Sequence, residues 1–165
     1  MDLLARAQIG ATFNQYADSA LLRRRLASYL DGRTNAPILL AGEAAGYRGA
    51  RVSGLPFTSE RQISGTGPAE ATATIVHRVL DELGVTEDVL LWNLVPTHPG
   101  TERSNRPPTR DEIEDAAPFL AELATGRRVI PVGRLAERRL GGPYVRHPSH
   151  GGAGEFRRSL VAALG

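Results

Sequence analysis

Apolar residues recur every three or four positions in several segments of this chain, as they do on the buried face of an amphipathic helix. Leucines recur every fourth residue over 22–30, just after Asp18 and Ser19, either of which can cap a helix. Thr109 and Glu112 have the spacing of a capping box and open a second such segment. Helices are therefore predicted from Ser19, from Pro68 to Gly84, from Thr109 through Leu123, over 134–140 and over about 154–164.

Four short apolar runs lack the helical period and predict buried strands: 37–42 ("PILLAG"), 89–95 ("VLLWNLV"), 128–133 ("RVIPVG") and 144–148 ("YVRHP"). Strands and helices alternate, which is typical of a parallel sheet covered by helices. We therefore expect an α/β fold, namely a three-layer α/β/α sandwich with a central, mainly parallel four-stranded sheet. The 165 residues have the usual size of one domain, so residues 1–165 are taken as a single domain.

Polar side chains follow three of the predicted strands. Glu43 comes directly after the first strand, Asn93 lies late in the second and His147 lies at the end of the fourth. In open parallel sheets, ligands bind outside the carboxyl ends of the strands. We therefore expect these three groups to converge on one cleft, with Phe57 on a neighbouring loop.

Composition narrows the chemistry that such a cleft can perform. The chain has no cysteine, so disulfides, iron–sulfur clusters and thiolate zinc sites are excluded. All 20 basic residues are arginine, so no lysine can form a Schiff base with a substrate. His147 and His150 have no acidic neighbour in sequence and predict no metal site.

The first residues, "MDLLARAQIGATF", lack the pattern of a signal peptide, and no apolar stretch approaches the roughly 20 residues of a membrane span. A soluble cytoplasmic protein is expected, acting as a monomer and without a membrane partner. The formal net charge is only +2, so total charge does not argue for a nucleic-acid partner.

Each of the unusual side chains also has an ordinary explanation. Glu43 fits a solvated carboxylate at a helix start, Asn93 a satisfied core amide, and Phe57 a loop residue that plugs a core. Together, however, they supply the parts needed to remove a base from a nucleotide. Phe57 offers a ring for stacking, Asn93 a donor and an acceptor, His147 a donor for a developing anion, and Glu43 a carboxylate for water or a sugar cation.

Six segments resemble the uracil-DNA glycosylase superfamily, in that family's order, and they are closest to the bacterial branch whose first motif is Gly-Glu-Ala-Pro-Gly. In chain order they are "GEAAGYRG", "GLPFTSE", "WNLVPTHP", "NRPPTRDEIEDAAPFL", "VIPVGRLAERRLGG" and "RHPSHGG". They cover most of the chain.

The resemblance implies a role for each matching residue. Glu43 matches the acid that acts on water or on the oxocarbenium-like sugar, and His147 the histidine that stabilises the departing uracil anion. Phe57 matches the ring that stacks on the flipped uracil, and Asn93 the amide that reads its Watson–Crick edge. From its place in the first motif, Tyr47 is the candidate for excluding thymine at the C5 position.

The same resemblance implies further contacts with the base and the DNA. Gly42 and Ala44 of the first motif are expected in the base pocket. The loop that contacts phosphates and enters the duplex corresponds to Ser149 and the turn after it. The expected DNA-binding residues are Ser149, His150, Gly151, Arg48 and Arg106.

Several positions depart from the family pattern. Ala45 stands where the first motif has proline, and residues near Thr97 and Ala116 stand in place of the cysteines that bind the family's iron–sulfur cluster. Asn105 stands where a related branch, which links covalently to uracil, has a histidine. We therefore expect no cofactor and no covalent trapping, and His150 is an additional basic side chain on the insertion loop.

The implied reaction is hydrolysis of the N-glycosidic bond of deoxyuridine in DNA, which leaves an abasic site and begins base excision repair. Without lysine, the enzyme is expected to be monofunctional. Three alternatives remain at this point: a glycosylase for hypoxanthine, xanthine or mismatched T, a non-catalytic module that binds damaged DNA, and a nucleotide-binding α/β enzyme. "GEAAG" lacks the features of a P-loop or a dinucleotide fingerprint, which disfavours the last.

Overall fold

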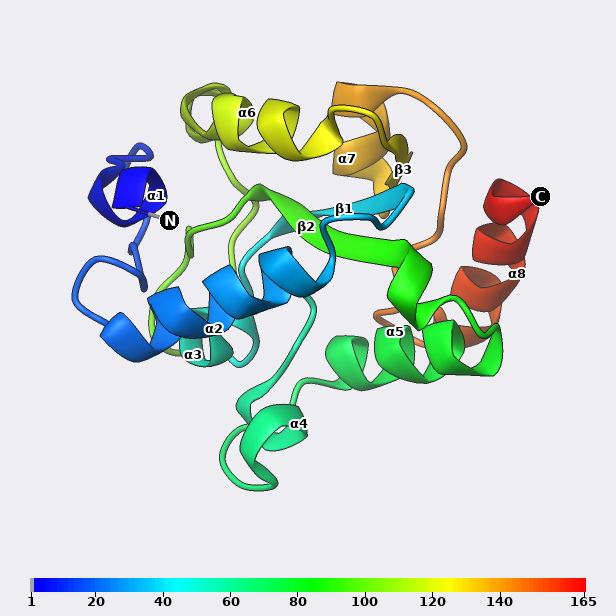
Figure 1. Cartoon of the computed structure of the whole chain (residues 1–165), viewed down its shortest axis with the longest axis horizontal. Helices are drawn as coiled ribbons and strands as arrows, with labels where there is room; N and C mark the ends of the chain where they lie inside the picture. Colours follow the sequence, from blue (N-terminus) through cyan, green and yellow to red (C-terminus); the bar gives the residue numbers. More distant parts are fainter. Residues whose placement is uncertain (1) are drawn as a thin grey trace.

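Three parallel strands form the central sheet, in the order β2–β1–β3 (Figure 1). The structure is a computed structural model and describes residues 2–165. The strands are β1 (Ile38–Ala44), β2 (Val89–Val95) and β3 (Arg128–Pro131). In the register of β1 with β2, Gly42 lies opposite Asn93, which places two of the predicted site residues side by side.

Helices precede, connect and follow the strands. They are α1 (Asp2–Arg6), α2 (Ala20–Gly32), α3 (Ala50–Ser53), α4 (Glu60–Ser64), α5 (Ala71–Glu82), the 3₁₀ helix η1 (Thr86–Asp88), α6 (Arg110–Ala124), α7 (Arg134–Leu140) and α8 (Ala153–Leu164). Within residues 2–165, no helix has the length and apolar character required to cross a membrane.

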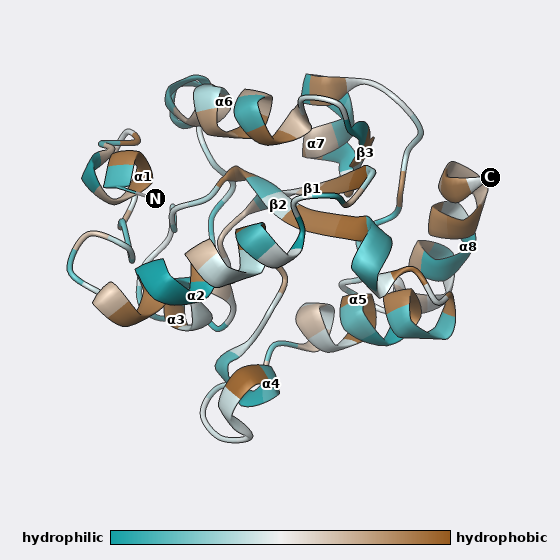
Figure 2. Ribbon diagram, in the orientation of Figure 1, coloured by the Kyte–Doolittle hydropathy of each residue, from teal (hydrophilic) through white to brown (hydrophobic). Residues whose placement is uncertain are grey.

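The side chains of β1 alternate between two apolar cores on opposite faces of the sheet. Leu39 and Ala41 pack with residues of α2 and α6, whereas Leu40 packs with residues of α5 and α8. All three are fully buried, as a strand at the centre of a covered parallel sheet must be. The strands are largely apolar, while the helices carry both apolar and hydrophilic residues (Figure 2). The α/β/α arrangement is thus present.

The prediction of a fourth strand over 144–148 is wrong. Only Val145 pairs with the sheet, through an isolated parallel bridge to Val132. The backbone N–H of Arg146 donates to Ser159 Oγ at 3.0 Å, and Pro148 has no N–H to donate. The ladder therefore stops after one residue, and the segment continues as a loop that carries His147.

The start of α5 also differs from the prediction. The helix begins at Ala71 and not at Pro68, because the Pro68 carbonyl accepts a hydrogen bond from the backbone N–H of Arg61 at 3.1 Å. Glu70 is consequently the residue that precedes the helix.

Both predicted helix caps are confirmed. Ser19 Oγ accepts from the Leu22 N–H at 3.3 Å at the start of α2. At the start of α6, Thr109 Oγ1 accepts from the Glu112 N–H at 3.2 Å, and Glu112 Oε2 accepts from the Thr109 N–H at 2.8 Å.

Glu112 has a second task that the capping box did not predict. Its carboxylate is 2% exposed and accepts two hydrogen bonds from Arg106, at 2.8 and 2.5 Å. These bonds, together with the cap, lower the pKa of Glu112. The pair fixes the loop before α6 against the helix.

We expect Arg106→Ala to lower the free energy of unfolding by about 2 kcal/mol, because it leaves a buried carboxylate without its charged partner. Arg110→Ala is the matched control, since Arg110 pairs with Glu114 in an exposed position, where water and salt screen the pair and its loss changes the free energy of unfolding little. Urea denaturation of both variants measures the difference.

The pH dependence of the free energy of unfolding gives a second check on the contribution of the Arg106–Glu112 pair. Because the pKa of folded Glu112 is lowered, its stabilisation is complete above the ordinary value of 4.5 and is lost as the pH falls through the folded value. The difference in the free energy of unfolding between wild type and Arg106→Ala must therefore become smaller in acid. Equal losses for the two arginine variants at neutral pH would contradict this account.

Candidate active site

A cavity of about 320 Å³ opens at the carboxyl ends of β1 and β2. Its walls come from segments far apart in sequence. Most of the predicted site residues line it: Glu43, Ala44, Phe57, Asn93, Arg106, His147, Ser149 and His150. A second cavity of about 310 Å³ adjoins the first and shares Glu43, His147 and Ser149 with it.

Phe57 lines the first cavity, and its ring packs against Gly42 of β1. An ideal Cβ on Gly42 would lie 2.3 Å from Phe57 Cζ and 2.8 Å from Asn93 Oδ1. Only glycine therefore lets the ring and the amide approach the strand this closely. Gly42 does not line the cavity itself, and it acts by leaving room for the two residues that do.

The backbone of Phe57 has a φ of +51°, which is unusual for a bulky residue. Hydrogen bonds on both sides hold this conformation. Ser53 Oγ accepts from the Leu55 N–H at 3.0 Å and donates to the Thr58 carbonyl at 2.7 Å. The ring is thus oriented by the loop rather than by its own preference.

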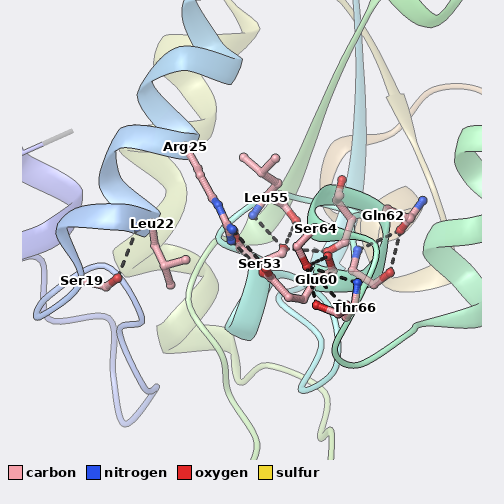
Figure 3. A network of polar contacts seen from close by, with 11 residues as sticks. Ser19, Leu22, Arg25, Ser53, Leu55, Glu60, Gln62, Ser64 and Thr66 are labelled. Atoms are coloured by element: carbon pink, nitrogen blue, oxygen red, sulfur yellow. Dashed lines mark hydrogen bonds and ion pairs between the residues drawn. The ribbon is translucent and has the colours of Figure 1, made fainter.

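An ion pair ties this loop to α2 (Figure 3). Arg25 makes two hydrogen bonds to the Glu60 carboxylate, at 2.7 and 3.0 Å, and a third to the Ser53 carbonyl at 3.2 Å. The network raises the pKa of Arg25 and lowers that of Glu60, so both remain charged. The loop that carries Phe57 is therefore anchored at both ends.

Asn93 is 4% exposed and yet keeps its hydrogen-bonding capacity free. No group within residues 2–165 forms a hydrogen bond with its side-chain amide, and the side chain lines the cavity. Buried amides are normally paired, so an unpaired one at a cavity points to a ligand. Asn93 is therefore not the hydrogen-bonded core amide that was the other interpretation of the sequence.

Glu43 is half-buried at the end of β1. Burial raises the pKa of its carboxyl group, and the charge of Arg138 and the backbone N–H of Leu135 oppose the rise. An ideal Cβ on Gly133 would lie 3.4 Å from Glu43 Oε1 and 3.7 Å from His147 Cβ. The two predicted catalytic residues therefore flank the same point, where the two cavities meet.

The imidazole of His147 is oriented by the loop that follows it. Ser149 donates its backbone N–H to His147 Nδ1 at 3.3 Å, and its hydroxyl lies 2.9 Å from the same nitrogen. Because Nδ1 accepts, the proton of the neutral ring is assigned to Nε2. Burial lowers the pKa of His147, and the charges of Arg146 and His150 act in the same direction. A neutral donor therefore faces the site at neutral pH.

The loop after His147 forms a tight turn, in which the Gly152 N–H donates to the Ser149 carbonyl at 3.1 Å. Its two central residues, His150 and Gly151, have φ values of +52° and +74° and are exposed. Positive φ is costly for His150, and two consecutive residues with positive φ are typical of a type I′ turn. His150 reaches the cavity wall, whereas Gly151 does not line it.

Three predicted residues are placed less directly. Tyr47 does not line the cavity, and its ring lies under the guanidinium of exposed Arg48, 5.4 Å from centroid to Cζ. The Tyr47 N–H donates to Asn105 Oδ1 at 2.9 Å, which joins two walls of the cavity. Arg106 lines the cavity, but its guanidinium is held by Glu112. The roles of these residues towards DNA stay predictions.

Several other lining residues were not predicted from the sequence, and the polar ones among them, besides Asn105, are Glu70 and Thr72. They follow a loop that has no strand before it, so the rule about strand ends does not find them. Among the residues that the structure describes, no cluster of three or more His, Asp or Glu side chains is arranged to hold a metal ion.

The comparison with protein families identifies the class. The model of the uracil DNA glycosylase superfamily matches residues 30–162, which include every element of the site. The chain therefore belongs to the uracil DNA glycosylase superfamily. Its place in a branch of that superfamily stays a prediction.

Among solved structures, the chain is similar to the crystal structure of wild-type Pedobacter heparinus SMUG2. The TM-score is 0.70, with 12% identity over 99% of this chain and 94% of that chain. At this identity the similarity shows that the fold is shared. No curated protein matches the sequence.

The tautomer of His147 can be measured by ¹⁵N NMR of the histidine side chains. We expect a neutral ring with the proton on Nε2 at pH 7, and a titration midpoint below the ordinary 6.5. In His150→Asn the midpoint must rise, because one of the charges that lowers the pKa of His147 is gone. A midpoint above 6.5 in wild type would contradict the assigned environment.

Proposed function

We propose that the protein is a monofunctional uracil-DNA glycosylase, which hydrolyses the N-glycosidic bond of deoxyuridine in DNA and leaves an abasic site. Membership in the superfamily supports action on DNA as a glycosylase. The observation that carries the proposal is the unpaired Asn93 amide, which lies beside the Phe57 ring in a cavity that also holds Glu43 and His147.

Asn93 and Phe57 bind and recognise the base. Uracil presents an N–H between two carbonyl oxygens, and an amide can accept from that N–H while it donates to a neighbouring oxygen. The ring of Phe57 supplies the apolar face on which a planar base stacks. Because the amide has no internal partner, the bound base is what satisfies it.

His147 stabilises the leaving group. When the glycosidic bond breaks, negative charge develops on the uracil oxygens, and a donor already aimed at them lowers the barrier. The lowered pKa of His147 keeps the ring neutral, so it donates a hydrogen bond from Nε2 without transferring a proton. Ser149 holds the ring in this orientation.

Glu43 serves the sugar side of the bond. As C1′ loses the base it gains positive charge, and a nearby carboxylate stabilises that charge and orients the water that adds to it. The position of Glu43 between the two cavities gives water a place beside the carboxylate while the base occupies the first cavity.

The target nucleotide must leave the helical stack before it can enter this cavity, at a cost of a few kcal/mol. Contacts with phosphates offset that cost, and the proposed site for them is the exposed turn at His150 and Gly151, of which His150 lines the cavity. Exposed Arg48 is a further candidate for such a contact.

Hypoxanthine, xanthine and mismatched T remain alternative substrates, because small changes in the pocket redirect base preference. The non-catalytic DNA-binding module is the other alternative. It is disfavoured by the orientation of His147 and by the burial of Glu43, since a passive binder needs neither.

Cleavage of labelled oligonucleotides tests the proposal directly. Each carries one U, hypoxanthine, xanthine or mismatched T, in single or double strands, and is treated with alkali after the reaction. We expect breaks at U that depend on alkali, because the chain has no lysine side chain to form the Schiff base through which β-elimination cleaves the strand.

His147→Ala should slow the reaction by about 10²–10³-fold, as removal of one preorganised donor typically does. Glu43→Gln should also slow it, whereas Glu122→Gln removes an exposed carboxylate of α6 and serves as the control. Salt-sensitive binding with no break at any base would refute the enzymatic proposal and favour the binding module.

A further inference from the structure

Glu70 is a second carboxylate on the wall of the base cavity, and none of the roles above uses it. It lies directly before α5 and lines the same cavity as Glu43 and Asn93. A negative charge beside a DNA-binding cavity repels phosphates and opposes the anion that forms when a base departs. Its presence there requires a partner that offsets both effects.

The turn after β1 is built to admit this carboxylate. An ideal Cβ on Gly46 would lie 2.4 Å from Glu70 Oε1, and one on Gly49 would lie 2.2 Å from Oε2. Side chains at either position would therefore displace the carboxylate. The two glycines of "GYRG" thus leave room for the Glu70 carboxylate against the turn and beside the cavity.

The carboxylate has no partner of its own in the part of the chain that the structure describes. No hydrogen bond or ion pair within residues 2–165 reaches its oxygens, and burial alone raises the pKa of Glu70. An unpaired, partly buried carboxylate is costly unless a donor arrives. This distinguishes Glu70 from Glu60 and Glu112, which are both held by arginines.

DNA offers few donors that could fill this place. Within a strand, phosphates and deoxyribose carry no N–H or O–H, so the donors come from the bases. Uracil has one ring N–H available when it is attached to the sugar, and the Asn93 carbonyl is placed to accept it. A second acceptor in the same cavity therefore matches a base with a second donor.

We propose that Glu70 is a specificity-determining residue, which accepts a hydrogen bond from a second N–H or O–H donor on the flipped base. The inference rests on the glycosylase function proposed above and narrows its substrate class. Deaminated or oxidised bases that carry a second donor are bound more tightly than the corresponding bases that lack it.

Two pairs of bases isolate the second donor. Xanthine differs from hypoxanthine by a carbonyl and by an N–H that is retained only in mildly acidic buffer, in which that pair is measured, and 5-hydroxyuracil differs from uracil by one O–H. Each base is placed in an oligonucleotide as its 2′-fluoroarabino nucleotide, because the fluorine disfavours the sugar cation and prevents cleavage. Dissociation constants are then measured at fixed salt for wild type and variants.

In wild type we expect the base with the second donor to bind about tenfold more tightly in at least one pair, the usual scale for a hydrogen bond to a charged group. In Glu70→Gln this preference must fall below about threefold. Glu70→Ser is the second variant, since serine caps a helix well and removes the carboxylate without weakening the start of α5. Glu122→Gln removes an exposed carboxylate of α6 and must retain the wild-type ratios.

For each pair, the ratio of the two dissociation constants is compared between wild type and the variants. Ratios that are the same in wild type, Glu70→Gln and Glu70→Ser, for both pairs of bases, would overturn the inference. The binding assay does not depend on catalysis, so it separates this inference from the proposed function. If wild type cleaves no base and yet shows the ratios, the glycosylase proposal fails and the assignment of Glu70 stands. If wild type cleaves uracil and binds the two bases of each pair equally tightly, the glycosylase proposal stands and the assignment of Glu70 fails.

Discussion

The missing side chain at Gly42 is the constraint on which the site depends. Gly42 is at the centre of the sheet, opposite Asn93, and the Phe57 ring fills the space that a side chain would take. The positive φ of Phe57 and the Arg25–Glu60 pair that anchors its loop both serve this one contact. The ring and the amide can thus both lie against the end of a buried strand and line the cavity there.

Around this contact, each functional group is held by neighbours that leave its working atom free. Ser149 occupies Nδ1 of His147 and leaves Nε2 for a ligand, while Asn93 has neither amide atom engaged within residues 2–165. Arg106 is used differently, because it satisfies Glu112 and so fixes the loop that forms another wall. The polar groups of the cavity are therefore of two kinds: some are paired within the protein and support its walls, and others have an atom free to bind a ligand.

Much of this arrangement was predictable from local signals. The apolar runs predicted β1 and β2, the capping box predicted the start of α6, and the rule about strand ends placed Glu43 and Asn93 in one cavity. His147 lines the same cavity, although the strand predicted before it is reduced to one bridge at Val145. What failed depended on distant contacts. Ser159 takes the N–H that a fourth strand needed, the Pro68 carbonyl is bound by Arg61, and Glu70 enters the cavity only because of two glycines.

A crystal structure of the protein with abasic DNA and free uracil would test the central claim most directly. We expect uracil stacked on the ring of Phe57, with its N–H edge at the Asn93 amide and one carbonyl oxygen within hydrogen-bonding distance of His147 Nε2. A cavity that stays empty at saturating uracil, or uracil bound away from Asn93, would contradict that claim.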